Sequence, residues 1–183
     1  MKTMSKTYLL YWGIMILLVY SLADVAKANE TYLHYDITTD PSICGDRISD
    51  IFYDEINNRV LISTGYFWDP AVTSSWRGAS EQYSDGICVL NRNTNTVTKY
   101  NVSNSAIPTN VYKSITWGDN LIIAGSYYSG IVVINEITGE IRVFNKNSSP
   151  ALKTGIYSLE TAPISSLKYE NGKIYFSYGE YTE

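Results

Sequence analysis

The sequence predicts an all-β protein built from a repeated unit of four short antiparallel strands. A strand–turn–strand segment occurs twice, starting at Gly86 and again at Gly130, and a different strand pair occurs three times. Tyr contributes 17 of the 183 residues and charged residues only 17%, a composition typical of sheets and turns. Four short strands in repeats of about 40–50 residues indicate the blades of a β-propeller.

The strand pair that occurs three times opens each unit. Its positions Ile51, Ile115 and Leu167 are 64 and 52 positions apart, and each is followed two residues later by an aromatic residue. A polar turn and a second apolar strand come next, and Asn171-Gly172 is a strong hairpin signal. The predicted units span about residues 48–101, 112–145 and 164–183.

The duplicated segment supplies the third and fourth strands of the first two units. In the third unit the expected Gly-Ile-x-Val-x-Asn strand is missing. Residues 32–36 resemble a fourth strand and are expected to close a ring. We therefore expect an incomplete β-propeller of about two and a half blades, either the N-terminal part of a longer protein or one of several self-associating copies joined through open blade edges.

The first 28 residues are expected to be a signal peptide. A positively charged start precedes an apolar run from Tyr8 to Ala23, and residues 26–28 match an A-x-A cleavage site. The alternative is an uncleaved membrane anchor, since the run is slightly short of a full span. Both hypotheses place residues 29–183 outside the cytoplasm, as a secreted, extracellular or periplasmic domain or one anchored to a membrane and facing outward.

The repeat resembles the two-component-regulator propeller repeats over Ile48 to Glu183. Gly130 to Gly139 matches the family's Gly-Leu-x-x-Tyr-Asp-x-x-Thr-Gly pattern, and residues 107–111 match its Leu-Pro-Ser-Asn-x-Val pattern. YVTN-type and quinoprotein-like propellers are close alternatives. The resemblance implies an extracytoplasmic sensor region of a signalling receptor, or a secreted binding protein.

A binding site is expected where the links between the second and third strands and between successive units gather, because loops held by a rigid scaffold carry function. The link over residues 67–82 is the longest and combines aromatic, acidic and basic side chains suited to a carbohydrate or protein ligand. Its alternative role is structural, with the Trp rings packed on the blade and Arg77 paired with Glu81. The candidate ligand-binding residues are Trp68, Asp69, Trp76, Arg77, Glu81, Tyr127 and Tyr128.

Composition argues against several other functions. A net charge of -4 disfavours a nucleic-acid partner. His34 is the only histidine, and no zinc, calcium or phosphate-binding motif is present, so we expect no cofactor, no metal site and no catalysis. Asp46, Asp50 and Asp54 are expected to be solvated. The alternatives are part of a polysaccharide lyase or hydrolase with its acidic residues elsewhere, and a surface-layer or adhesion module.

Covalent features agree with export. Cys44 and Cys88 form an even pair, and a disulfide between the entry loop and the first unit is one hypothesis, with a small buried Cys88 as the other. Three sequons, at Asn29, Asn101 and Asn147, are candidate glycosylation sites.

Overall fold

The structure is a computed structural model that describes Tyr35 and residues 38–39, 42–45, 47–65, 84–152 and 162–178. The chain divides into two compact parts, Met1–His34 and Tyr35–Glu183, and all described residues belong to the second. The predicted signal peptide and, apart from Tyr35, the predicted strand 32–36 lie outside these residues. Over the described residues, no helix has the length and apolar character needed to cross a membrane.

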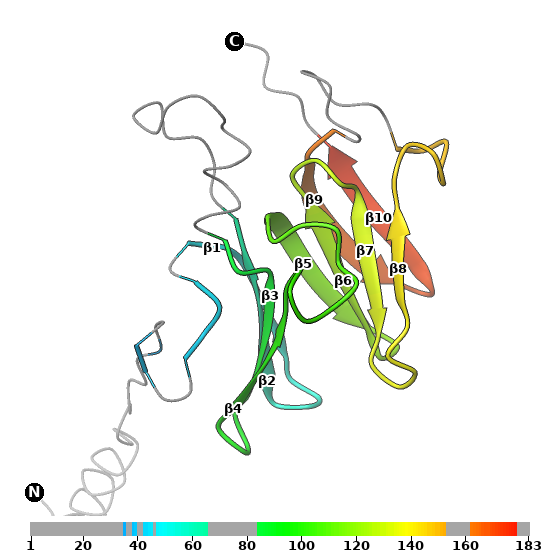
Figure 1. Ribbon diagram of the computed structural model, residues 1–183. Helices are drawn as coiled ribbons and strands as arrows, with labels where there is room; N and C mark the ends of the chain where they lie inside the picture. Colours follow the sequence, from blue (N-terminus) through cyan, green and yellow to red (C-terminus); the bar gives the residue numbers. More distant parts are fainter. Residues whose placement is uncertain are drawn as a thin grey trace, which may run out of the picture. The chain divides into compact units, whose positions relative to one another are not determined.

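In the described part of the chain, ten antiparallel strands form three sheets (Figure 1). The first sheet has the order β1–β2–β3–β4, the second β5–β6–β7–β8, and the third pairs β9 with β10. The all-β class and the four-stranded antiparallel sheets are thus confirmed, and the arrangement is consistent with propeller blades. The strand bounds are Ile48–Asp54 (β1), Arg59–Thr64 (β2), Ile87–Asn91 (β3), Thr96–Tyr100 (β4), Tyr112–Gly118 (β5), Leu121–Ser126 (β6), Ile131–Asn135 (β7), Ile141–Phe144 (β8), Ile164–Glu170 (β9) and Lys173–Tyr178 (β10).

Asparagine chemistry makes the short turns. Asn58, Asn95 and Asn171 adopt positive φ, which Asn tolerates better than most residues. The third strand of each full sheet ends in an asparagine, Asn91 or Asn135, whose Oδ1 accepts two backbone N–H groups of the turn that follows. These local bonds replace ladder bonds at the point where the strand ends, so the chain reverses there.

The first strand of every sheet carries an irregularity at the same place. The register shifts between Ile48 and Asp50 in β1 and between Tyr112 and Ser114 in β5. The third sheet shows the shift where Tyr178 pairs with Ile164. The three strand pairs therefore superpose residue by residue, with Ile51 equivalent to Ile115 and to Leu167.

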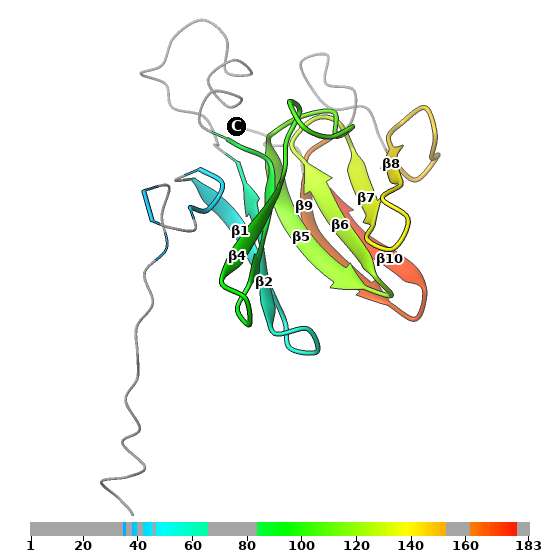
Figure 2. The same cartoon turned by 60° about the horizontal axis from the view of Figure 1, so that its bottom comes forward.

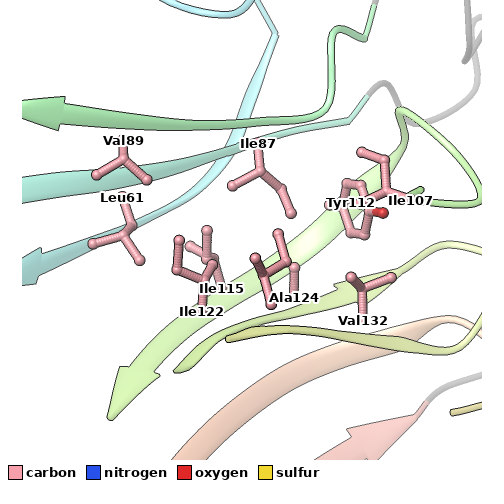
Figure 3. Packing of buried hydrophobic residues seen from close by; sticks show 10 residues of the cluster. Leu61, Ile87, Val89, Ile107, Tyr112, Ile115, Ile122, Ala124 and Val132 are labelled. Carbon is pink, nitrogen blue, oxygen red and sulfur yellow. The ribbon is translucent and has the colours of Figure 1, made fainter. Parts of the chain in front are cut away.

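The main hydrophobic core lies between the first and second sheets (Figure 3). Leu61 and Val89 of the first sheet face Ile115 and Ile122 of the second, and all four are buried. Residues opposite one another in neighbouring strands share a face of the sheet. We call the face turned to the preceding sheet the leading face and the one turned to the following sheet the trailing face.

Strand β6 is buried on both sides. Ile122 packs into the core with the first sheet, whereas the next residue, Ile123, packs with Ile164 and Leu167 of the third sheet. The first strands β1, β5 and β9 follow one another side by side, β1 against β5 and β5 against β9 (Figures 1 and 2). The second sheet is therefore the part that connects the other two.

The entry segment packs on the leading face of the first sheet. Ile43 and Cys44 form a buried cluster with Ile62 and Cys88, and Tyr35 packs against it. A disulfide joins Cys44 to Cys88, as one of the two sequence hypotheses predicted, with 5.7 Å between the Cα atoms. The alternative of a free, buried Cys88 is excluded.

Candidate functional site

The links β2–β3, β4–β5 and β6–β7 leave from the same end of the sheets, because successive strands run antiparallel. Figure 2 shows the β4–β5 and β6–β7 links together at this end. Residues 66–83 of the β2–β3 link lie outside the described part of the chain. The predicted ligand residues Trp68, Asp69, Trp76, Arg77 and Glu81 fall within that stretch, so their role stays a prediction.

Both ends of the β2–β3 link are fixed by hydrogen bonds. The Thr64 hydroxyl donates to the Gly86 carbonyl oxygen at 2.9 Å and accepts from the Asp85 N–H at 2.9 Å. The Gly65 N–H donates to the Arg47 carbonyl at 2.9 Å. The link therefore starts and ends at defined positions on the sheet edge.

Gly86 is required where β3 begins. Its φ is +88°, and a Cβ there would overlap the Tyr100 carbonyl oxygen of β4. Gly130 repeats this arrangement at the start of β7, with a φ of +93° and the Phe144 carbonyl oxygen in the same place. These two glycines are the first residues of the duplicated segment, so their occurrence has a steric reason.

The β4–β5 link is ordered by Asn101. Its side-chain oxygen accepts the N–H groups of Ser103 and Asn104 and the Ser103 hydroxyl, while its Nδ2 donates to Asp85 at 3.0 Å. The Asp85 contact ties this link to the end of the β2–β3 link. Asn145 starts the β8–β9 link in the same way, with its Oδ1 accepting from the Asn147 N–H.

The candidate glycosylation sites differ in the environment of the asparagine side chain. The Nδ2 of Asn101, the atom that a glycan would modify, is engaged with Asp85, whereas Asn147 is exposed. Asn29 lies outside the described residues. The glycosylation of all three remains a prediction.

The two predicted tyrosines of the β6–β7 link occupy different environments. Tyr128 is only 1% exposed, packs with Val111, and its hydroxyl accepts a hydrogen bond from Thr109 at 2.9 Å. Tyr127 is partly exposed and meets the Tyr128 ring edge-on, with the ring centroids 6.3 Å apart. Tyr128 thus has a packing role here, and Tyr127 is the ring with a surface to offer a ligand.

Lys113 adds a positive charge beside this ring. Its Nζ lies 5.6 Å from the centroid of Tyr127, within cation–π range. Burial lowers the pKa of Lys113 because desolvation disfavours the charged form. At the end of the sheets from which these links leave, the described residues therefore combine the aromatic ring of Tyr127 in the β6–β7 link with the ammonium group of Lys113 on β5.

A charged cluster that sequence reasoning missed lies at the opposite end. The Arg59 guanidinium donates to both carboxylate oxygens of Glu136 at 2.6 Å and, through Nε, to Asp54 at 2.7 Å. The Trp117 indole N–H donates to Glu136 at 2.7 Å, and the guanidinium lies 5.3 Å from the Trp117 ring centroid. The hydrogen bonds that Arg59 donates to the Glu136 carboxylate raise the pKa of Arg59.

The environment of Asp54 in this cluster corrects the expectation from the sequence. It was expected to be solvated, but it is only 2% exposed, and its carboxylate is bound by Asn57 and Arg59 of its own hairpin. Burial raises the pKa of Asp54, yet hydrogen bonds from Asn57 and Arg59 outweigh that effect, so the pKa lies below its ordinary value. Asp50 is also engaged: its Oδ2 accepts from the Ile115 N–H at 2.9 Å.

The charged cluster holds the sheets together and offers no reactive group, because both of its carboxylates are bound to Arg59. Within the described ranges, no group of three or more His, Cys, Asp or Glu side chains is placed to hold a metal ion.

Comparison with known proteins gives a likeness to solved structures but none to a protein family. No protein-family model matches the chain, and no curated protein matches it. The extracellular domain of a putative hybrid two-component system from B. thetaiotaomicron is similar, at 18% identity and a TM-score of 0.45. The match covers 73% of this chain and 22% of that one, so this chain spans about a fifth of its length.

Proposed function

We propose that the chain is an extracytoplasmic binding or sensor module of the β-propeller type, without catalytic activity. The observation that supports the proposal is the repeated geometry of the sheets: the strands carry equivalent irregularities in β1, β5 and β9, and their antiparallel order lets the links β2–β3, β4–β5 and β6–β7 leave from one end. Loops presented in this way are a common location for ligand recognition.

The disulfide supports the extracytoplasmic part of the proposal. Structural disulfides persist in oxidising compartments and are rare in the cytosol. Cys44–Cys88 is buried within an apolar cluster, so it supports the packing of the entry segment on the first sheet. An N-terminal apolar segment of the kind that directs export precedes it in the sequence.

The ligand class that we propose is a carbohydrate or a protein segment with an anionic or hydroxyl-rich surface. Tyr127 supplies an aromatic face and Lys113 a cation beside it. Aromatic rings stack on the apolar faces of sugars and side chains, and an ammonium group attracts acidic or hydroxyl groups. The sequence places Trp68 and Trp76 in the neighbouring link.

The test is binding of the purified chain to a glycan array and to a set of acidic peptides. We expect a ligand whose affinity falls roughly tenfold in Tyr127→Ala and in Trp68→Ala, a loss of about 1.4 kcal/mol. Ile137→Ala, an exposed change in the turn at the opposite end, should leave binding unchanged. Cleavage of a polysaccharide on the same array would contradict the proposal, since it would show an enzyme.

A further inference from the structure

The described residues cover only about half of the leading face of the first sheet. The entry segment, through Ile43 and Cys44, covers the part formed by the central strands β2 and β3. The part formed by β1 is open: Ile51 is 56% exposed, and Tyr53 and Ile48 are also exposed. Ile51 and Tyr53 share this face with Ile62 and Val60, their partners in β2.

The equivalent face of the second sheet shows what covers such a surface. Ile115, which corresponds to Ile51, is only 3% exposed because Leu61 of the first sheet packs against it. Trp117, which corresponds to Tyr53, lies under the Arg59 guanidinium. In both cases the covering residue lies in β2, the second strand of the preceding sheet. The open part of the first sheet therefore matches the footprint of one such strand pair.

The third sheet is a strand pair whose trailing face is not covered by any other described sheet. Tyr175 is 50% exposed, whereas the equivalent residues Leu61 and Ile123 are completely buried against the sheet that follows each. Glu170 and Lys173, opposite one another at the end of this pair, occupy the positions of Asp54 and Arg59 in the first sheet. The trailing face of the third sheet thus has a carboxylate and a cation where the first sheet has them.

The polar groups of the two open faces also correspond. Across the existing contact, Ser114 donates to the Ile164 carbonyl of the next first strand at 3.3 Å. Ser166 of β9 occupies the position of Ser114 and is exposed. The Ile48 carbonyl of β1 occupies the position of the Ile164 carbonyl. Each open face therefore supplies one half of a contact that the molecule already makes internally.

From this correspondence we propose that a second copy of the chain docks head to tail. The trailing face of the third sheet in one copy covers the β1 face of the other. Ile51 packs on Tyr175, as Ile115 packs on Leu61, and Tyr53 lies beside Lys173, as Trp117 lies beside Arg59. The interface is heterologous, because the two faces differ, so the assembly grows as a ring or as an open chain. This inference does not depend on ligand binding at the links β2–β3, β4–β5 and β6–β7.

The test uses one substitution on each face of the disulfide-intact protein. We expect the unmodified chain to associate as its concentration rises from micromolar to millimolar in sedimentation velocity. Ile51→Glu and Tyr175→Glu should each weaken association roughly a hundredfold, because each places an uncompensated charge at the centre of the contact. An equimolar mixture of the two variants should form dimers and nothing larger, since each variant keeps the face that the other lacks.

Ile137→Glu is the matched control. Ile137 is an exposed apolar residue in the β7–β8 turn, away from both faces, and its substitution should leave association unchanged. A chain that remains monomeric across the concentration range overturns the proposal. A mixture of the two variants that remains monomeric also overturns it, since only a heterologous contact predicts complementation. If a glutamate variant fails to fold, Ile51→Ser and Tyr175→Ser carry the same predictions.

Discussion

The two junctions between sheets share one geometry but differ in their polar groups. At the first junction, between the first and second sheets, Arg59 is held between Asp54 and Glu136, and all three are mostly buried. At the second junction, between the second and third sheets, the Tyr169 hydroxyl donates to Asp119 at 2.7 Å in an exposed position. The apolar contacts thus set the packing, while the polar groups give each junction its own response to pH and substitution.

Substitution of two adjacent residues of β6 tests the two junctions one at a time. Ile122→Ala removes side-chain contacts from the first junction, and Ile123→Ala removes them from the second. Both side chains are completely buried, so we expect losses of unfolding free energy of about 4 and about 3 kcal/mol, within the range for such cavities. The first junction has the larger cluster of buried residues, which is why its loss is the larger. Urea unfolding measures both, and a larger loss in Ile123→Ala would contradict this ranking.

Arg59→Met tests the charged cluster. The substitution keeps much of the aliphatic volume but leaves Asp54 and Glu136 without their cation. Removing one partner of a buried ion pair costs about 3 kcal/mol, so we expect a loss of that size in urea unfolding. Arg142→Met is the control, because the Arg142–Glu140 pair is exposed and exposed ion pairs contribute little to stability. Equal effects of the two substitutions would show that the cluster contributes little.

Acid should weaken the first junction. The pKa of Asp54 is lower in the folded protein than its ordinary value, so the unfolded chain binds a proton more readily. The stabilisation from Asp54 is therefore present above about pH 4 and is lost as the pH falls through the folded pKa. We expect the difference in unfolding free energy between the unmodified chain and Asp54→Asn to shrink over this range. Ser114→Ala, at the second junction, should show a difference that does not change with pH.

The smallest effect is expected at Tyr169. Tyr169→Phe removes the hydrogen bond to Asp119 but keeps the ring, which packs in the core of the second junction. The bond is exposed, so the loss of unfolding free energy should be small. Tyr169→Ala should cost several times more, because it also removes the apolar contacts. If the two substitutions had equal effects, the hydroxyl would be the important group and the contrast between the junctions would be wrong.

Much of the fold could be predicted because its signals are local. The alternation of apolar residues, the Asn-rich turns and the glycines at positions 86 and 130 all act within one sheet. The all-β class and the four-stranded sheets followed from them. The disulfide could also be proposed, since Cys44 and Cys88 were placed on the entry loop and the adjoining sheet.

The charged cluster could not be predicted because it depends on packing between sheets. Glu136 lies 77 positions from Arg59, and only the contact of the two sheets brings them together. Asp54 looks solvated in the sequence because it ends a strand at a polar turn, yet it is buried and bound by Asn57 and Arg59, which depends on how the turn folds back. Tyr128 is a candidate ligand residue in the sequence, and its burial depends on Thr109 and Val111 of another link.

The burial of β6 on both sides has a consequence for local opening. Separation of one junction leaves Ile122 or Ile123 still packed at the other, so the amides of β6 should exchange with deuterated water only when both junctions have opened. Strands at the margins, such as β10, lack that double protection. We therefore expect the second sheet to keep its strand pairing when a neighbouring sheet opens locally. The links that leave from β6 should keep their position during such opening.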